Sequence, residues 1–118
     1  MQHSFTVYPK SILPNGFTYP AAYLQLSKNM YSLQNINFLW WFQDSATGAG
    51  VRAYELRNKI KGLNLIPLAR YGDWAAYFDG DDQTGSPKVY VLDLGNLSNC
   101  IELENFDEWL YKASTGTF

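Results

Sequence analysis

Few residues in this sequence of 118 could act as nucleophiles, general bases or soft metal ligands. It contains one histidine, His3, and one cysteine, Cys100. A Ser-His-Asp triad or a Cys-His dyad needs an imidazole held beside the nucleophile, and His3 falls in the least regular part of the chain. Zinc sites need several His or Cys ligands. The sequence therefore predicts neither nucleophilic catalysis nor a transition-metal site, and it predicts no cofactor.

Carboxylates are more numerous, and they suit two other kinds of site. The run Asp-Gly-Asp-Asp-Gln-Thr at 79–84 begins like a calcium loop, but its sixth position is threonine instead of glycine and its twelfth is tyrosine instead of glutamate. A carboxylate pair for glycoside hydrolysis could be drawn from Asp73, Asp79 and Asp81, although acids are common in turns. We interpret 79–84 as an acidic hairpin loop, with weak cation binding or contact with a partner as alternatives.

A glycine pattern at 48–53, Gly-Ala-Gly-Val-Arg-Ala, matches the dinucleotide-binding motif G-x-G-x-x-G/A. It lies between a predicted strand and a predicted helix, and Asp73 follows about 20 residues later, as in that motif. However, the connection from Phe42 is long for the tight turn, and the residues beyond Asp73 predict hairpins without further βα units. We therefore predict a flexible loop that leads into a helix, and no nucleotide site.

The first half of the chain predicts an arm, two helices and one strand. Residues 1–17 predict an irregular arm that packs through Phe5, Val7 and Tyr8 and ends in a turn at 14–16. Thr18 suits the cap of a helix over 20–28. The aromatic run 37–42 predicts a central strand with both faces covered. A helix with a basic outer face is expected over 51–61, stopped by Gly62.

The second half predicts antiparallel strands at 63–69, 74–78 and 88–92, with a fourth at 99–103. Asn105 suits the cap of a closing helix with Phe106, Trp109 and Leu110 inward, and 114–118 predicts a frayed tail. The expected fold is a single α+β domain over 1–118, with a mainly antiparallel sheet of about four to six strands flanked by helices. The longest apolar stretch is far too short to cross a bilayer, and no secretory signal precedes it, so we expect a cytoplasmic protein.

The aromatic residues could form a sugar-binding platform, but all four tryptophans fall inside predicted elements, where packing in the core is the usual role. Tyr71, at a predicted turn, is the better candidate for an exposed contact. Charge is also divided along the chain. Up to Gly72 there are seven Lys and Arg against two Asp and Glu, a net charge of +5, and from Asp73 onward two against nine, a net charge of −7. Such segregation is typical of a docking surface for a partner of opposite sign, as well as of ordinary solvated surface.

The second half also resembles the SUKH superfamily. In that family a strand ending in a "lipfa" phrase leads through a glycine turn to a strand ending in "fD", then to a "Vy.wd" strand and a closing "sFeeFl" helix. The order is the same here, and the entry at 13–17 followed by helix 20–28 resembles the family's "lP..y..fl" phrase. The matching residues are Leu-Ile-Pro-Leu-Ala at 65–69, Gly-Asp-Trp at 72–74, Tyr-Phe-Asp at 77–79, Val-Tyr-Val-Leu-Asp at 89–93 and Asn-Phe-Asp-Glu-Trp-Leu at 105–110.

This resemblance implies a single SUKH-like domain that works by binding. Bacterial members are mostly immunity proteins that neutralise a cognate polymorphic toxin, which implies stoichiometric occlusion of a toxin domain without catalysis. If the toxin is a basic nuclease, the acidic half could mimic phosphate and steer association. We expect no nucleic-acid or membrane partner, and a monomer or weak homodimer. The alternatives are a non-immunity adaptor and a small carbohydrate-binding module or glycoside-acting enzyme. The candidate partner-binding residues are Tyr71, Asp73, Asp79, Asp81 and Asp82.

Overall fold

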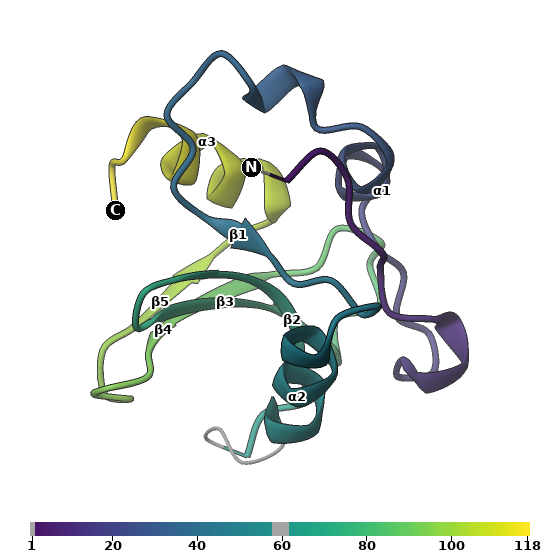
Figure 1. Ribbon diagram of the computed structural model, residues 1–118. Coiled ribbons are helices and arrows are strands. Elements are labelled where there is room, and N and C mark those ends of the chain that lie inside the picture. The colour runs from purple at the N-terminus through teal and green to yellow at the C-terminus, as the bar shows by residue number, and fades with distance from the viewer. Residues whose placement is uncertain (1, 58–61) are drawn as a thin grey trace.

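The computed structural model describes residues 2–57 and 62–118, and its centre is a five-stranded antiparallel sheet (Figure 1). The strands follow one another in chain order across the sheet, so each pairs with its neighbours in sequence. This arrangement confirms the α+β fold class. The strands are β1 (Trp41–Phe42), β2 (Leu65–Tyr71), β3 (Trp74–Asp79), β4 (Val89–Asp93) and β5 (Cys100–Leu103).

Helices cover both faces of this sheet. Figure 1 shows α1 (Ala21–Lys28) and α3 (Phe106–Thr115) on one face and α2 (Gly48–Leu56) on the other, beside β2. Two short 3-10 turns, η1 (Lys10–Ile12) and η2 (Tyr31–Leu33), interrupt the connections before β1. The arm at the start of the chain packs along the outside of β1 and the residues after it, since Gln2 bonds to the backbone of Phe42 and the amide of Ser45 donates to the carbonyl of Thr6.

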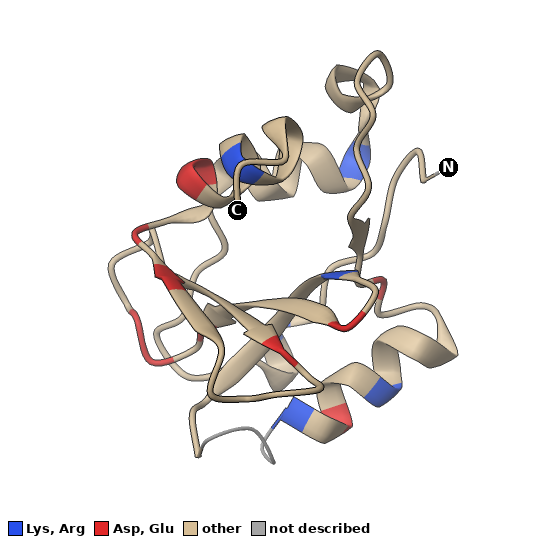
Figure 2. Ribbon diagram, turned by 90° about the vertical axis from the view of Figure 1, so that its left-hand side faces the viewer, with Lys and Arg blue, Asp and Glu red and all other residues tan. Residues whose placement is uncertain are grey.

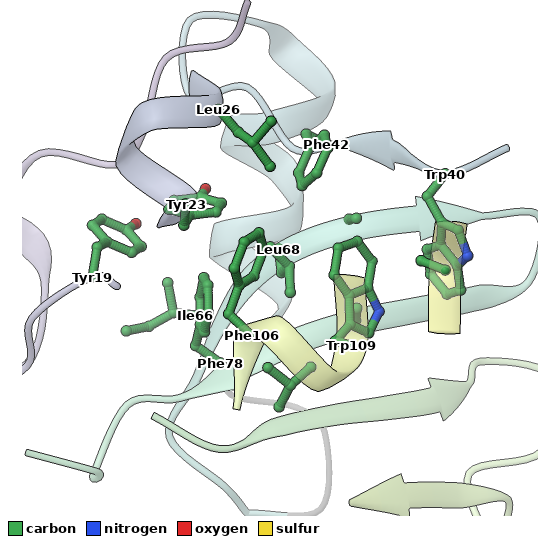
Figure 3. Packing of buried hydrophobic residues seen from close by; sticks show 14 of the residues in the cluster. Tyr19, Tyr23, Leu26, Trp40, Phe42, Ile66, Leu68, Phe78, Phe106 and Trp109 are labelled. Carbon is green, nitrogen blue, oxygen red and sulfur yellow. The ribbon is translucent and has the colours of Figure 1, made fainter. Parts of the chain in front are cut away.

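The core lies between the sheet and the α1/α3 layer, and aromatic rings dominate it (Figure 3). Trp109, on α3, is fully buried, and its ring packs at 5.8 Å from Phe42 and 5.5 Å from Trp40, measured between ring centroids. Asn105 accepts a hydrogen bond from the amide of Glu108 at 2.9 Å, so the predicted cap of this helix is confirmed. α3 extends through Thr115, and the tail expected from residue 114 therefore begins later.

Three expectations about the first half are wrong. The strand at 37–42 shortens to two residues and forms an edge of the sheet, not its centre, because the chain beyond Phe42 turns away to begin α2. The helix expected over 20–28 is present as α1, but Pro20, not Thr18, occupies its cap position. The glycine pattern at 48–53 is not a loop, because it forms the first turns of α2, which Thr47 caps by accepting from the Gly50 amide.

Packing explains the second glycine of that pattern. A Cβ on Gly50 would lie 1.8 Å from the carbonyl oxygen of Asp44, so only glycine lets the start of α2 approach this backbone. The carbonyl of Gly50 also accepts a hydrogen bond from the Tyr8 hydroxyl at 2.6 Å. Gly50 is thus fixed by contacts inside the domain. Residues 58–61 of the helix expected over 51–61 lie outside the described residues, whereas Gly62, its expected stop, has a φ of +66°.

Candidate functional site

The run from Phe38 to Phe42 alternates strictly between core and solvent. Phe38 packs against the core, and Trp40 and Phe42 are buried in it. Leu39 and Trp41, between them, are 52% and 55% exposed. Alternation of this kind is the period of an extended chain, in which successive side chains point to opposite faces. Two large apolar side chains, one on β1 and one two residues before it, therefore project into solvent. The expectation that every tryptophan lies in the core is wrong for Trp41.

Tyr71, at the end of β2, completes this exposed group. It is 46% exposed, and together with Leu39 and Trp41 it lines a hollow of about 590 Å³ between the β1/β2 end of the sheet and α2. We call these three residues the aromatic edge. Arg52 of α2 and Arg70 of β2 line the same hollow. The hollow thus combines exposed aromatic surface with two guanidinium groups.

Arg70 is held in place at this hollow. Its Nη2 and Nε donate to the carbonyl oxygen of Gly72, at 2.7 Å and 3.3 Å. Gly72 has a φ of +59°, in the left-handed region that the two-residue β2–β3 turn requires. The turn chemistry therefore fixes the direction of one of the two cations beside Tyr71, which limits the conformational entropy that a partner would have to remove on binding.

A second hollow, of about 470 Å³, lies on the opposite face of the sheet, at the end of α3. Leu39 and Tyr71 line this hollow as well, with Trp40, Trp74 and Phe118. The ring of Trp40 stands 5.8 Å from that of Tyr71 and 5.7 Å from that of Phe118. The aromatic edge therefore separates two hollows, one on each face of the sheet, and the residues lining both include no carboxylate in the part of the chain that the structure describes.

The backbone of β1 is closed to further strand pairing. The side-chain amide of Gln2 donates from Nε2 to the carbonyl of Phe42 at 2.8 Å, and the Phe42 amide donates back to Gln2 Oε1 at 2.8 Å. Gln2 thus occupies the place that the backbone of another strand would take. Any partner at this edge must contact side chains, because the main-chain groups of Phe42 are already satisfied.

The structure divides the five predicted site residues into two groups. Tyr71 and Asp73 lie at the β2–β3 turn, whereas Asp79, Asp81 and Asp82 lie at the other end of β3. Because β3 spans six residues, the two groups are about 17 Å apart along the strand. Tyr71 is exposed, as its position at a turn predicts. The five residues do not form one contact surface.

The carboxylates of the acidic group shape their own loop. Asp82 accepts from the hydroxyl and the amide of Thr84, at 2.6 and 3.0 Å, and from the amide of Lys88 at 3.1 Å. The hydrogen bond from the Thr84 hydroxyl contributes most to lowering the pKa of Asp82. The Asp79 carboxylate accepts a hydrogen bond from the amide of Asp81. The Asp81 carboxylate accepts one from the side-chain amide of Asn64. Exchanging these residues would disturb the loop as well as its charge.

Sequence reasoning missed Leu39, Trp41, Arg52 and Arg70. One signal was present. Four apolar residues in a row at 39–42 can all be buried only in a central strand. The second half of the chain already supplied enough strands to place this run at an edge, where half of its side chains face solvent. Figure 2 shows acidic positions over β4, β5 and the start of α3, whereas α2 carries both signs and further basic positions lie on α1 and α3. The aromatic edge thus has two cations beside it, Arg52 and Arg70, and one exposed acid, Asp73, in the adjoining turn.

Other kinds of site find little support in the described residues. In residues 2–57 and 62–118, no three His, Cys, Asp or Glu side chains gather as metal ligands would. None of the helices described is long and apolar enough to cross a bilayer. His3 contacts Gln34 across 3.3 Å, whereas Cys100 begins β5. Comparison with protein-family models, with curated proteins and with solved structures gives no match.

Proposed function

We propose that this protein is a protein-binding module of the immunity type, which neutralises a bacterial toxin domain by covering it in a stoichiometric complex. The observation that carries the proposal is the aromatic edge: Leu39, Trp41 and Tyr71 stand in solvent beside Arg52 and Arg70. The ordered resemblance of residues 65–110 to the SUKH superfamily supports a toxin as the partner.

The composition of the aromatic edge suits a protein contact. Tyr, Trp and Arg are the residue types that most often dominate the binding energy of interfaces. Trp41 and Tyr71 present large amphipathic surface with few rotatable bonds, so ordering them on binding costs little entropy. The hollows on either side of the edge would receive side chains of the partner. An occluding inhibitor needs only such a preformed surface and no reactive group.

The decisive experiment is co-expression with the toxin domain encoded beside this gene, with growth and co-purification as readouts. We expect rescue of growth and a one-to-one complex. Trp41→Ala and Tyr71→Ala should each weaken the complex by about 30-fold or more, the loss typical of a hot-spot residue. Tyr111→Ala is the matched control, because Tyr111 is a more exposed tyrosine, at 67%, on α3.

Two results would contradict this proposal. If Tyr111→Ala weakened the complex as much as Tyr71→Ala, the aromatic edge would not be the contact. If the protein co-purified with a host protein but gave no protection against the toxin, it would be an adaptor instead. Isothermal titration of purified toxin domain distinguishes weakened binding from loss of folding, provided that the circular dichroism of each variant is unchanged.

The acidic residues would have a secondary role in this proposal, that of steering a basic toxin such as a nuclease. Asp73 is exposed and lies beside the aromatic edge, in the same turn as Gly72. Asp73→Lys should therefore slow association and reduce its dependence on salt, because steering acts mainly on the association rate. Asp73→Asn, which removes the charge without reversing it, should give about half of that effect on the logarithm of the rate.

A further inference from the structure

β5, the other edge strand of the sheet, has outward backbone groups that nothing pairs. β5 bonds only to β4, in a register that sets Ile101 opposite Val91 and Leu103 opposite Val89. The amide of Asp93 donates to the carbonyl of Asn99 at 3.1 Å in the same register. In an antiparallel ladder, bonded pairs alternate with non-bonded ones, so positions 99, 101 and 103 face β4. The main-chain groups of Cys100 and Glu102 therefore point away from the sheet.

No described residue closes this edge in the way that Gln2 closes β1. The backbone of Cys100 and Glu102 has no hydrogen-bond partner outside the β4 ladder in residues 2–57 and 62–118. Both side chains are exposed. α3 lies over the core face of the sheet (Figure 1), not along the outer side of β5, where Cys100 and Glu102 are exposed. Two amides and two carbonyls are thus available in the spacing of a strand.

The charge around this edge is mainly negative. Between Lys88 and Lys112 there is no lysine or arginine, whereas five acids occupy the same stretch. Lys88 approaches Glu102 at 3.8 Å, but both side chains are half exposed and solvent screens the pair. The five acids are Asp93, Glu102, Glu104, Asp107 and Glu108.

We propose that β5 accepts an extended, basic segment of a partner protein as a sixth strand of the sheet. Open main-chain groups supply the pairing, as in other cases of strand addition, and the acidic side chains select a segment rich in Lys and Arg. A second copy of this chain is the less favourable occupant, because antiparallel β5–β5 pairing would bring the Glu102 and Glu104 carboxylates of both copies together.

The register also determines the pattern of the segment. Glu102 points to the sheet face opposite the core, beside Tyr90, its partner in β4. Ile101 points to the core face and lines the hollow of about 470 Å³. Since side chains of neighbouring strands align on each face, the added strand should carry basic residues on the Glu102 face and apolar residues on the Ile101 face. Alternating Lys and Val satisfies both.

A capped octapeptide of alternating Lys and Val is the probe for this inference. We expect it to bind at low salt, to shift the amide signals of Cys100 and Glu102 in nuclear magnetic resonance spectra, and to slow their hydrogen exchange at least tenfold. An octapeptide of alternating Glu and Val should not bind. A Lys-Val peptide N-methylated at the positions that face β5 should lose binding, because it keeps the charge but not the donors.

Cys100 allows a test from the protein side. Cys100→Pro removes an outward amide without breaking a bond to β4, and the first residue of a strand tolerates proline. Its matched control is Cys100→Ala, which keeps the amide. We expect Cys100→Pro to weaken the peptide about 3- to 10-fold relative to Cys100→Ala, as the loss of one main-chain hydrogen bond predicts. Glu102→Lys should weaken it more than Glu102→Gln.

The inference is overturned if the Lys-Val peptide shifts signals at Trp41 instead of Cys100 and Glu102, if the N-methylated peptide binds equally well, or if the Glu-Val peptide competes. Protection of the same two amides in the protein alone, rising with its concentration, would make the occupant a second copy and would equally overturn it. The inference is judged on the main-chain groups of β5, whereas the proposed function depends on toxin binding by Trp41 and Tyr71, so that failure of the first would leave the second standing.

Discussion

The two edges of the sheet offer opposite kinds of surface. At β1 the backbone is satisfied by Gln2, but Leu39 and Trp41 stand in solvent. At β5 the backbone of Cys100 and Glu102 is open, while the nearby side chains are short or acidic. The first edge can be recognised only through side chains and the second mainly through the main chain.

This difference shows how one small sheet can carry two contacts without aggregating. An edge with both open backbone and apolar side chains would invite pairing with another copy. Here β1 has exposed apolar side chains but no open backbone, and β5 has open backbone but few exposed apolar side chains. The four predictions that follow remove one of these features at a time, beginning with the largest expected effect.

Neighbouring residues of β1 should differ sharply in their contribution to stability. Phe42 is fully buried, and its ring stacks on Phe5 at a centroid distance of 4.6 Å. Phe42→Ala should lower the free energy of unfolding by about 3–5 kcal/mol, since it leaves a cavity in the core. Trp41→Ala should lower it by less than about 1 kcal/mol, as is usual on the surface. Urea denaturation measures both, and equal losses would contradict the outward direction of Trp41.

Opening the β1 edge should make it resemble β5. Gln2→Ala removes both hydrogen bonds to Phe42 and should cost about 1–2 kcal/mol of stability. Hydrogen exchange of the Phe42 amide should then approach the fast rate expected for Cys100 and Glu102. Gln25→Ala, at an exposed position of α1, is the control and should leave the Phe42 amide protected. Unchanged protection of the Phe42 amide in Gln2→Ala would show that the hydrogen bonds from Gln2 are not what protects this edge.

Removing the charge from β5 should make that edge self-associate. The double variant Cys100→Val with Glu102→Val places β-branched side chains on an open edge, which favours pairing between copies. We expect dimers that increase with concentration in sedimentation velocity, and a change in monomer stability within about 0.5 kcal/mol. Cys100→Val alone retains the carboxylate and should stay in the oligomeric state of the parent. The same state for all three proteins would refute the role of Glu102.

The smallest effect should appear at Tyr90, beside the β5 edge. Burial, followed by the charges of Asp79 and Glu102, raises the pKa of Tyr90 to about 12. Since the unfolded chain releases this proton near pH 10, the contribution of Tyr90 to stability is intact below pH 10 and is lost as the pH rises towards 12.

Glu102→Gln should move the pKa of Tyr90 back towards 10, because one of the neighbouring charges is lost. Glu104→Gln is the control and should leave it in place. The chemical shift of the Tyr90 ring carbon that bears the hydroxyl, followed against pH, reports the change. A Tyr90 that titrates at its ordinary value in the unaltered protein would contradict the partial burial of its ring.

The elements that could be predicted from the sequence are those with local signals. The turn at Gly72 and Asp73, the alternation of the strands from 63 to 92 and the side-chain cap at Asn105 depend on residues only a few positions apart. The strand at 99–103 was predicted on the same basis. All of them occur in the structure within two residues of the expected bounds.

The strand count gave a signal for the place of the aromatic edge, but the outward direction of Leu39 and Trp41 is hidden in the sequence. Alternation is visible only where the outward residues are polar, and from 38 to 42 the outward Leu39 and Trp41 are as apolar as their inward neighbours. The division of the acidic residues was equally out of reach, because a net charge counted along the chain does not tell which end of a strand each residue occupies. Of the aromatic edge, the sequence identified only Tyr71 as exposed.

The two hydrogen bonds between the Gln2 side chain and the Phe42 backbone, here called the Gln2 clamp, also bear on how the domain folds. From β2 to β5 every pairing joins neighbours in the chain, so these hairpins close short loops, whereas the clamp joins residues 40 positions apart. Because the entropy lost on closing a loop grows with its length, the local meander should form first and the arm should dock on it later. The β5 edge, although later in the sequence, would therefore be complete before the aromatic edge at β1.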